Sequence, residues 1–329
     1  MTRKYLFVLA AALLSASAPA DDAAPWTTYS INPDRISVSG ISSGGYMASQ
    51  LHVAYSELMG GLGLIAAGPW GCSRANLLRA LGPCVKGGEL DVAPDVEKSR
   101  SLAAAGSIDD VAALKDDHIW LFHGTEDAAI GRSVVAGAEA FYRALAPTAD
   151  IVVEDSVPAA HGLPTVDKGA GCSEFVSPYL NACGYDLAGE LLRHVTDQAD
   201  AKPGGGAAAL REVDLTQALT PAQLEAAHLL PSAFLYVPEH CAEQACGVHV
   251  MLHGCQQSSE KIGNQLAQNG GFNRWADSLS LIVLYPQVRS SAVNPLGCWD
   301  WWGYTGPDYL LKDAPQIKAL RDLIAGLSQ

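Results

Sequence analysis

The sequence predicts an α/β protein with one mostly parallel central sheet flanked by helices. Short apolar runs typical of buried strands alternate with helical stretches along the chain. One such run, Arg35–Ser39, leads directly into the pentapeptide Gly-Ile-Ser-Ser-Gly at positions 40–44. A Gly-x-Ser-x-Gly run between a strand and a helix is typical of the nucleophile elbow of α/β-hydrolases. We therefore expect an α/β-hydrolase fold.

Ser42 is the candidate nucleophile of this elbow. A catalytic serine must lie on a turn sharp enough to hold its hydroxyl clear of the backbone, and flanking glycines leave room for the passing chain. The helix expected from Gly45 onward would place its N-terminus behind Ser42, where it favours developing negative charge. The pentapeptide alone also fits an ordinary turn, so the strand and helix around it carry the assignment.

The first twenty residues predict a secretory signal peptide. Arg3 and Lys4 form a basic start, Tyr5–Leu14 is apolar but too short to span a bilayer, and Ala18-Pro19-Ala20 fits a small-x-small cleavage site. A membrane anchor is the alternative, which the short apolar run disfavours. We expect export of the mature chain to the periplasm or the medium.

The composition limits the partners of the mature chain, residues 21–329. The full sequence has a formal net charge of -14, and removal of the signal with Arg3 and Lys4 makes the charge two units more negative. This acidic balance argues against nucleic acid and anionic membranes as partners. No later stretch reaches 18 apolar residues, so no membrane contact is expected after cleavage. We expect no cofactor and no metal, and the oligomeric state is left open.

The first half of the chain supplies further strands and a helix of the expected sheet. They are Leu62–Ala67, His118–Phe122 and Asp150–Glu154 as strands and Val134–Leu145 as a helix.

The second half follows a linker-like Gly- and Ala-rich segment at 198–209. Its expected strands are Leu210–Leu215, Ser232–Val237, Gly247–Gly254 and Leu279–Tyr285, and its expected helices are Thr220–Ala227, about 259–278 and Ala314–Leu327.

The order of two motifs predicts a circular permutation. In an ordinary α/β-hydrolase, a strand ending in His-Gly precedes the elbow, and the loop after it donates an oxyanion-hole N–H. Here His253-Gly254 follows the elbow. One permuted domain over 21–329, with the segment 198–209 joining the former termini, accounts for this order. Two separate domains are the alternative, but the second half has no elbow of its own.

A serine nucleophile needs a histidine base and a carboxylate that orients it. Asp127 lies in the loop after the strand 118–122, where a triad acid belongs, and Glu126 is the neighbouring alternative. His161 follows the next strand and is the candidate base. His123 lies at a strand end, where a structural role is more plausible than a basic one.

The tetrahedral oxyanion needs two backbone donors. The N–H of Ser43, directly after the nucleophile, and the N–H of Cys255, after His253-Gly254, are the candidates. His253 itself could serve only to shape the loop.

Eight cysteines in an exported chain predict four disulfides, although eight cysteines allow 105 pairings. A zinc site is disfavoured because no Cys-x-x-Cys occurs, and a cysteine nucleophile is disfavoured in an oxidising compartment. The order along the chain suggests local pairs: Cys72 with Cys84, Cys172 with Cys183, Cys241 with Cys246, and Cys255 with Cys298.

The segment Asn294–Tyr304 holds three tryptophans and a tyrosine. A buried aromatic cluster is one interpretation, and an apolar wall for a hydrophobic acyl group is the other.

These motifs together resemble poly(3-hydroxybutyrate) depolymerases of the circularly permuted single-domain type. The stretches are Gly-Ile-Ser-Ser-Gly-Gly-Tyr-Met-Ala, His-Gly-Thr-Glu-Asp, Ala-His-Gly-Leu-Pro-Thr, Leu-His-Gly-Cys-Gln-Gln-Ser and Asn-Pro-Leu-Gly-Cys-Trp-Asp-Trp-Trp. The resemblance implies a secreted serine esterase that cuts short-chain polyhydroxyalkanoates. It matches Ser42, Asp127 and His161 to the triad, Ser43 and Cys255 to the oxyanion donors, and Trp302 to the substrate crevice. We expect no separate polymer-binding domain in this sequence, so adsorption to solid polyester would use the apolar surface of the catalytic domain.

Two other functions fit the same scaffold. An esterase acting on feruloyl or acetyl groups of polysaccharides is the first alternative. A non-catalytic binding protein is the second, and a complete triad in the right order argues against it.

Overall fold

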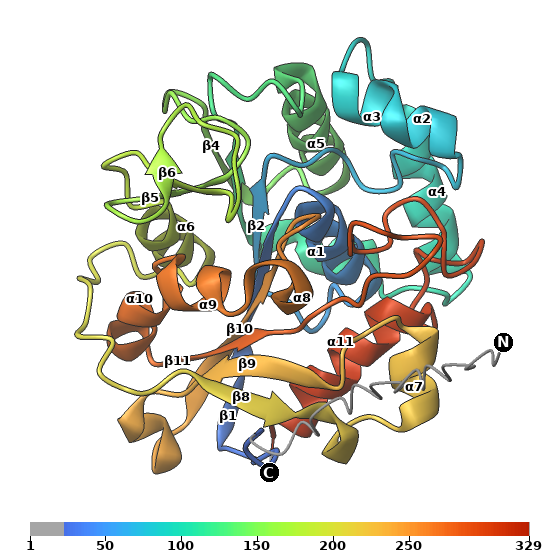
Figure 1. Cartoon of the computed structure of the whole chain (residues 1–329). Helices are drawn as coiled ribbons and strands as arrows, with labels where there is room; N and C mark the ends of the chain where they lie inside the picture. The colour runs from blue at the N-terminus through green and yellow to red at the C-terminus, as the bar shows by residue number, and fades with distance from the viewer. Residues whose placement is uncertain (1–22, 329) are drawn as a thin grey trace, which may run out of the picture.

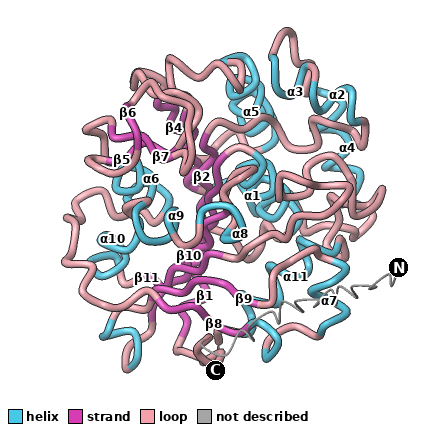
Figure 2. Tube along the Cα trace, in the orientation of Figure 1, coloured by secondary structure: helices cyan, strands magenta, loops and turns pink. Residues whose placement is uncertain are grey.

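The computed structural model describes residues 23–328, and both halves of the chain contribute to its eight-stranded sheet. The predicted signal peptide, residues 1–20, lies outside the described residues. The strand order is β4-β3-β2-β1-β10-β11-β9-β8, so the strand before the elbow, β1, lies at the centre (Figure 2). Its neighbours β2 and β10 both run parallel to it, and the antiparallel pairs of this sheet are β11–β9 and β9–β8.

The strands of this sheet follow the predicted apolar runs closely. They are β1 (Ile31–Ile41), β2 (Gly61–Ile65), β3 (His118–Phe122), β4 (Asp150–Glu154), β8 (Arg211–Asp214), β9 (Ser232–Tyr236), β10 (Cys246–Leu252) and β11 (Leu281–Tyr285).

Helices cover both faces of the sheet (Figure 1). The α-helices are α1 (Ser43–Ala54), α2 (Leu77–Leu81), α3 (Pro83–Lys86), α4 (Ala93–Ala104), α5 (Arg132–Leu145), α6 (Leu187–Val195), α7 (Pro221–Ala226), α8 (Ser259–Ile262), α9 (Gln265–Asn269), α10 (Phe272–Leu279) and α11 (Pro315–Gly326). Short 3-10 helices are η1 (Val111–Asp116), η2 (Leu215–Gln217) and η3 (Glu239–Ala242).

Alternation along the strands divides the core between the two faces. In β3, Ile119 and Leu121 join the cluster under α1, α5 and α11, whereas Trp120 and Phe122 join the cluster under α6 and α10. Both faces of the central strands are therefore buried, as a parallel sheet requires. The predicted α/β architecture is confirmed.

One predicted helix, about 259–278, is wrong as a single element. The segment forms three short helices, α8, α9 and α10. The breaks fall at Gly263 and at Gly270-Gly271, where Gly263 (φ 61°) and Gly271 (φ 92°) adopt left-handed backbone conformations. The expected strand from Leu279 also begins two residues later, because Leu279 ends α10.

A small second sheet was not expected from the sequence. Its three strands are too short to show periodicity, and they are ordered β5-β7-β6: β5 (Leu163–Thr165), β6 (Ala170–Gly171) and β7 (Leu180–Ala182). It follows β4 directly and forms part of the loop structure around His161.

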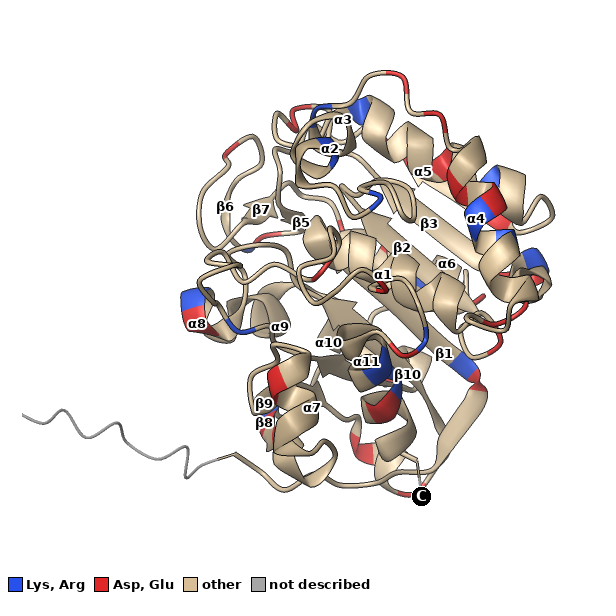
Figure 3. Ribbon diagram, turned by 90° about the vertical axis from the view of Figure 1, so that its right-hand side faces the viewer, with Lys and Arg blue, Asp and Glu red and all other residues tan. Residues whose placement is uncertain are grey.

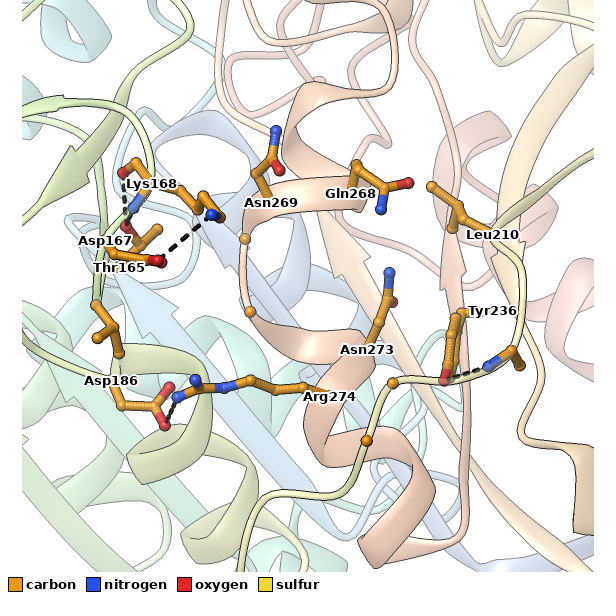
Figure 4. Close-up of a pocket in the computed structure, with 16 residues that line it drawn as sticks. Thr165, Asp167, Lys168, Asp186, Leu210, Tyr236, Gln268, Asn269, Asn273 and Arg274 are labelled. Carbon is orange, nitrogen blue, oxygen red and sulfur yellow. Dashed lines mark hydrogen bonds and ion pairs between the residues drawn. The ribbon is translucent and has the colours of Figure 1, made fainter.

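The Gly- and Ala-rich segment 198–209 contains no helix or strand but packs on α10 and β9. The N–H of Gly204 donates to the carbonyl of Arg274, and the N–H of Ala208 donates to the hydroxyl of Tyr236. It borders a polar hollow of about 260 Å³ in which Arg274 pairs with Asp186 (Figure 4). This segment is therefore attached to the body of the protein at several points.

Charged side chains of both signs are interspersed over α4, α5 and α11 (Figure 3). Neither sign of charge dominates these three helices. Within residues 23–328, no helix is both long enough and apolar enough to span a bilayer.

Candidate active site

Ser42 lies on a sharp turn between β1 and α1. Its backbone has φ 56° and ψ -120°, a conformation that non-glycine residues rarely adopt, and its N–H donates to the Ile65 carbonyl at 2.8 Å. A Cβ on Gly40 would collide with the backbone of Gly44, and a Cβ on Gly44 would collide with the Leu252 carbonyl of β10. The motif glycines are thus required because the elbow turns back on itself and packs on the neighbouring strand.

Asp127 and His161 form a close pair. Asp127 Oδ2 lies 2.8 Å from His161 Nδ1, and the two side chains are 1% and 12% exposed. Asp127 Oδ1 accepts hydrogen bonds from the N–H groups of Ala129 (2.8 Å) and Ile130 (2.9 Å). Because both carboxylate oxygens are engaged, the pair holds one orientation of the imidazole. Glu126, the alternative acid, is exposed.

The loops that carry these two residues are fastened to each other. The N–H groups of Thr125 and Glu126 donate to the carbonyls of Val157 and Ala159, four and two residues before His161. His123 is buried, and its Nε2 lies 3.0 Å from the Ile130 carbonyl. His123 therefore supports the Asp127 loop, in keeping with the structural role expected for it.

His253 shapes the loop between β10 and Cys255. Its Nδ1 donates to the Gly254 carbonyl at 2.8 Å, and its Nε2 accepts the Val288 N–H at 3.1 Å. Burial lowers the pKa of His253 to about 4, so the ring is neutral near pH 7. With both ring nitrogens used, His253 cannot serve as the base for Ser42.

The loop after β10 lies against the elbow. A Cβ placed on Gly254 would come within 3.4 Å of the Ser42 Cβ. The Cys255 N–H donates to no acceptor among the described residues, and Ser43 begins α1, where the first N–H groups of a helix have no intrahelical partner. Two free donors thus flank Ser42.

The four disulfides join the pairs that their order in the sequence suggested: Cys72–Cys84, Cys172–Cys183, Cys241–Cys246 and Cys255–Cys298. The last pair connects the loop after β10 to the tryptophan-rich segment. A second connection is the Trp299 N–H, which lies 3.3 Å from Ser43 Oγ. The disulfide and this hydrogen bond therefore connect the elbow, the loop after β10 that contains Cys255 (the donor loop) and the aromatic segment to one another.

A crevice of about 410 Å³ brings the candidate residues together. Ser42, Ser43, His161, Cys255 and Trp302 all line it. Asp127 does not line it, because its carboxylate contacts the Nδ1 of His161 from behind the ring.

The aromatic segment forms one wall of this crevice and is rigid. Trp301 stacks on Tyr46 of α1 with centroids 4.5 Å apart, and Trp302 packs edge-on against Trp301. The buried Asp300 carboxylate accepts hydrogen bonds from the N–H groups of Gly303, Tyr304 and Thr305. Trp301 is buried and Trp302 lines the crevice, so the segment is a packed aromatic cluster whose edge reaches the crevice.

Sequence reasoning missed the opposite wall. Leu77 and Leu81 of α2, Val85 of α3 and Phe175 line the crevice. The sequence clue that could have found this group is the three leucines within Leu77–Leu81, a segment too short for a helix that buries all of them. In the structure Leu77, Leu78 and Leu81 are 52%, 85% and 58% exposed. Exposed apolar side chains gathered at a cleft mark a binding surface.

A serine–histidine cluster also lies inside the sheet, away from Ser42. Ser39 Oγ is 2.7 Å from His249 Nε2 and Ser37 Oγ is 2.8 Å from His249 Nδ1, with all three side chains buried. Burial lowers the pKa of His249 to about 3. No substrate can reach this enclosed group, so we assign it to the pairing of β1 with β10.

The chain is similar to several known proteins. The family described as "Esterase PHB depolymerase" matches residues 231–318. A poly(3-hydroxybutyrate) depolymerase of Delftia acidovorans is 34% identical over 91% of this chain, which spans 60% of the length of that relative. A polyhydroxybutyrate depolymerase of Talaromyces funiculosus is 34% identical over 92% of this chain and 90% of its own length.

Two solved structures are also similar. One is a serine-to-alanine variant of a PHB depolymerase complexed with an R3HB trimer (TM-score 0.82, 31% identity, 93% of this chain and 100% of that chain). The other is the crystal structure of PHB depolymerase from Penicillium funiculosum (TM-score 0.81, 30% identity, with the same coverage). The chain belongs to the PHB depolymerase family.

Proposed function

We propose that the protein is a secreted serine esterase that hydrolyses poly(3-hydroxybutyrate), or related short-chain polyhydroxyalkanoates and their oligomers, through an acyl-enzyme. The observation that carries the proposal is one crevice lined by Ser42 on a strained elbow and by His161, which is oriented by a buried carboxylate. Ser42, Asp127 and His161 are the proposed triad.

The proposed reaction follows from this arrangement. His161 Nε2 takes the proton of Ser42 as its Oγ attacks the ester carbonyl, and Asp127 stabilises the imidazolium that forms. The N–H groups of Ser43 and Cys255 stabilise the oxyanion, each by about 3 kcal/mol in comparable acyl-transfer enzymes. His161 then protonates the departing alkoxide. In the second half, His161 activates a water that cleaves the acyl ester and regenerates Ser42.

The lining of the crevice supports a polyester substrate. Its walls are apolar side chains with few polar groups, which suits a chain of methyl-bearing ester units that carries no charge along its length. A related PHB depolymerase is known in complex with an R3HB trimer. Five of the nine large apolar side chains that are exposed among residues 23–328 line this crevice: Leu77, Leu81, Phe175, Val293 and Leu296. We propose that this rim contacts the solid polymer.

The domain organisation is part of the proposal. Residues 1–20 act as a signal peptide, and residues 21–329 form one circularly permuted α/β-hydrolase domain. Four disulfides support an exported protein. The permutation is supported by the end of α11, which meets the start of β1: the Tyr29 N–H donates to the Leu327 carbonyl at 2.7 Å. In an unpermuted chain, α11 would lead into β1.

The test compares wild type, Ser42→Ala and Ser101→Ala on three substrates: a suspension of poly(3-hydroxybutyrate), its soluble trimer, and a polysaccharide that carries feruloyl and acetyl esters. Ser101 is an exposed serine of α4 and serves as the matched control. We expect wild type and Ser101→Ala to clear the suspension and cut the trimer, and Ser42→Ala to lose activity by at least about 10⁴-fold. Hydrolysis that survives in Ser42→Ala would refute the nucleophile. Release of ferulate or acetate without any release of hydroxybutyrate would favour the polysaccharide esterase. Cleavage of the trimer without clearing would refute the role of the rim.

A further inference from the structure

Three side chains with metal-ligating atoms meet at the end of the sheet opposite the crevice. His118 is the first residue of β3, Asp150 is the first residue of β4, and His194 lies in the last turn of α6. His118 and Asp150 are paired in the parallel register of the two strands. One ligand atom from each of the three residues lies within 4.8 Å of the others.

The distances in this cluster suit a bridging cation better than hydrogen bonds. His118 Nδ1 lies 3.5 Å and His194 Nδ1 lies 3.9 Å from Asp150 Oδ2. Charge-assisted hydrogen bonds have donor–acceptor distances of about 2.7–2.9 Å. Ligands at about 2.0–2.1 Å from a tetrahedral Zn²⁺ lie about 3.3 Å from each other, so a metal would need only small movements of these side chains.

The tautomer of His194 points to a cation independently. Its Nε2 lies 3.1 Å from the backbone carbonyl of Asp150, which can only accept, so Nε2 carries the proton. In the neutral ring, the Nδ1 lone pair then faces the Asp150 carboxylate with no proton between them. Metal-ligating histidines characteristically donate their other N–H to a backbone carbonyl or a carboxylate. His194 already has the second interaction of a metal ligand.

The surroundings favour positive charge. His194 lies at the carboxyl end of α6, where the helix dipole stabilises a cation. The adjoining hollow of about 250 Å³ is lined by His118, by Arg35 and by four acidic side chains, Asp34, Asp116, Asp117 and Asp197, so carboxylates outnumber its one arginine. Lys115 offsets part of this charge through its pair with Asp116 at 3.7 Å. The three cluster side chains are 27%, 61% and 15% exposed, so an ion can enter from solvent.

We propose that His118, Asp150 and His194 bind one Zn²⁺, with water as the fourth ligand. Two imidazoles and one carboxylate select zinc over calcium or magnesium, which prefer all-oxygen sites. The ion would fasten the edge strand β4 and the end of α6, which runs into the segment 198–209, to β3. Its role is structural, because it lies away from the crevice.

The experiment uses the full-length secreted protein after treatment with EDTA and removal of the chelator. Zn²⁺ is titrated by calorimetry and the thermal unfolding midpoint is followed with and without Zn²⁺. The variants are Asp150→Asn and His194→Gln, and Asp116→Asn is the control because this exposed neighbour is not a proposed ligand. Asp150 is largely exposed, so Asp150→Asn should fold as the wild type does.

We expect wild type and Asp116→Asn to bind one Zn²⁺ per chain and to unfold at a higher temperature when it is bound. Both ligand variants should bind more than tenfold more weakly and lose that shift, since changes outside the ligand shell alone cost 10–100-fold. Co²⁺ in place of Zn²⁺ should give the visible absorption of a tetrahedral site in wild type and Asp116→Asn, but not in the two ligand variants. The proposal is overturned by no binding at 100 μM Zn²⁺, or by binding that Asp150→Asn leaves unchanged. Ester hydrolysis should be the same with and without Zn²⁺, so this test and that of the proposed function fail separately.

Discussion

At the scale of single residues, the role of Asp127 is open to a sharp test. Asp127→Asn keeps the shape of the side chain but removes the charge that stabilises the imidazolium and selects the tautomer of His161. We expect kcat on the soluble trimer to fall by about 10³–10⁴-fold, with little change in the unfolding midpoint. Glu126→Gln is the matched control and should retain activity, because Glu126 is exposed. A loss in Glu126→Gln that equals the loss in Asp127→Asn would reassign the acid.

Two buried histidines predict how stability depends on pH. Burial lowers the pKa of His253 to about 4 and of His249 to about 3, against about 6.5 in the unfolded chain. Above pH 6.5 both states are neutral. Below it, only the unfolded chain takes up protons, so the free energy of unfolding falls by about 1.4 kcal/mol per pH unit for each histidine, until each folded-state pKa is reached. Urea unfolding should show a loss of about 2 kcal/mol per histidine between pH 7.5 and 5.0. Equal stability at the two pH values would contradict these shifts.

At the scale of elements, the disulfide between Cys255 and Cys298 should matter for activity as well as stability. It closes a loop of 43 residues and braces the donor loop after β10. Replacing both cysteines by serine should lower the free energy of unfolding by about 3–4 kcal/mol and kcat by at least about tenfold. The control is the double serine variant of Cys241 and Cys246, which close five residues away from the crevice. That variant should lose about 2 kcal/mol and keep its kcat, and an equal loss of kcat in both would remove the special role of the first bridge.

Elements that depend on a short stretch of sequence were predicted well, whereas features that depend on distant segments meeting in the fold were not. Strand β3 has the predicted bounds because a buried parallel strand has a short apolar sequence, and the edge strand β4 has them because its Ile-Val-Val core is still apolar. The prediction of one helix over 259–278 was wrong because Gly263 and Gly271 adopt the left-handed conformations that end helices. Hydrophobic periodicity alone does not reveal where such glycines interrupt a helix. The Ser42, Asp127 and His161 assignments rest on loops directly after strands. Leu77 and Phe175 could not be placed at the crevice, because tertiary structure alone brings their segments there.

At the scale of the whole molecule, the two halves depend on each other. β10 of the second half lies directly beside β1 of the first half, and the residues that surround Ser42 come from both. Neither half has a complete crevice. This arrangement makes a permuted single domain a stronger proposal than two joined domains, because strands from before and after the segment 198–209 form one continuous sheet.

Reversing the permutation tests that proposal. A chain that begins at Gly206, ends at Gly204 and joins Ser328 to Tyr29 through a short Gly-rich linker restores the order in which α11 leads into β1. The contact between Tyr29 and Leu327 shows that such a linker has little distance to span. We expect the rearranged protein to fold, to keep the four disulfides and to cut the trimer within about tenfold of the wild-type rate, as measured by thiol titration and kcat. The control opens the chain instead within β10, between Val248 and His249, at the centre of the sheet, and should not fold. A rearranged chain that remains as unfolded as this control would argue that 198–209 is a linker between domains and not a join between former termini.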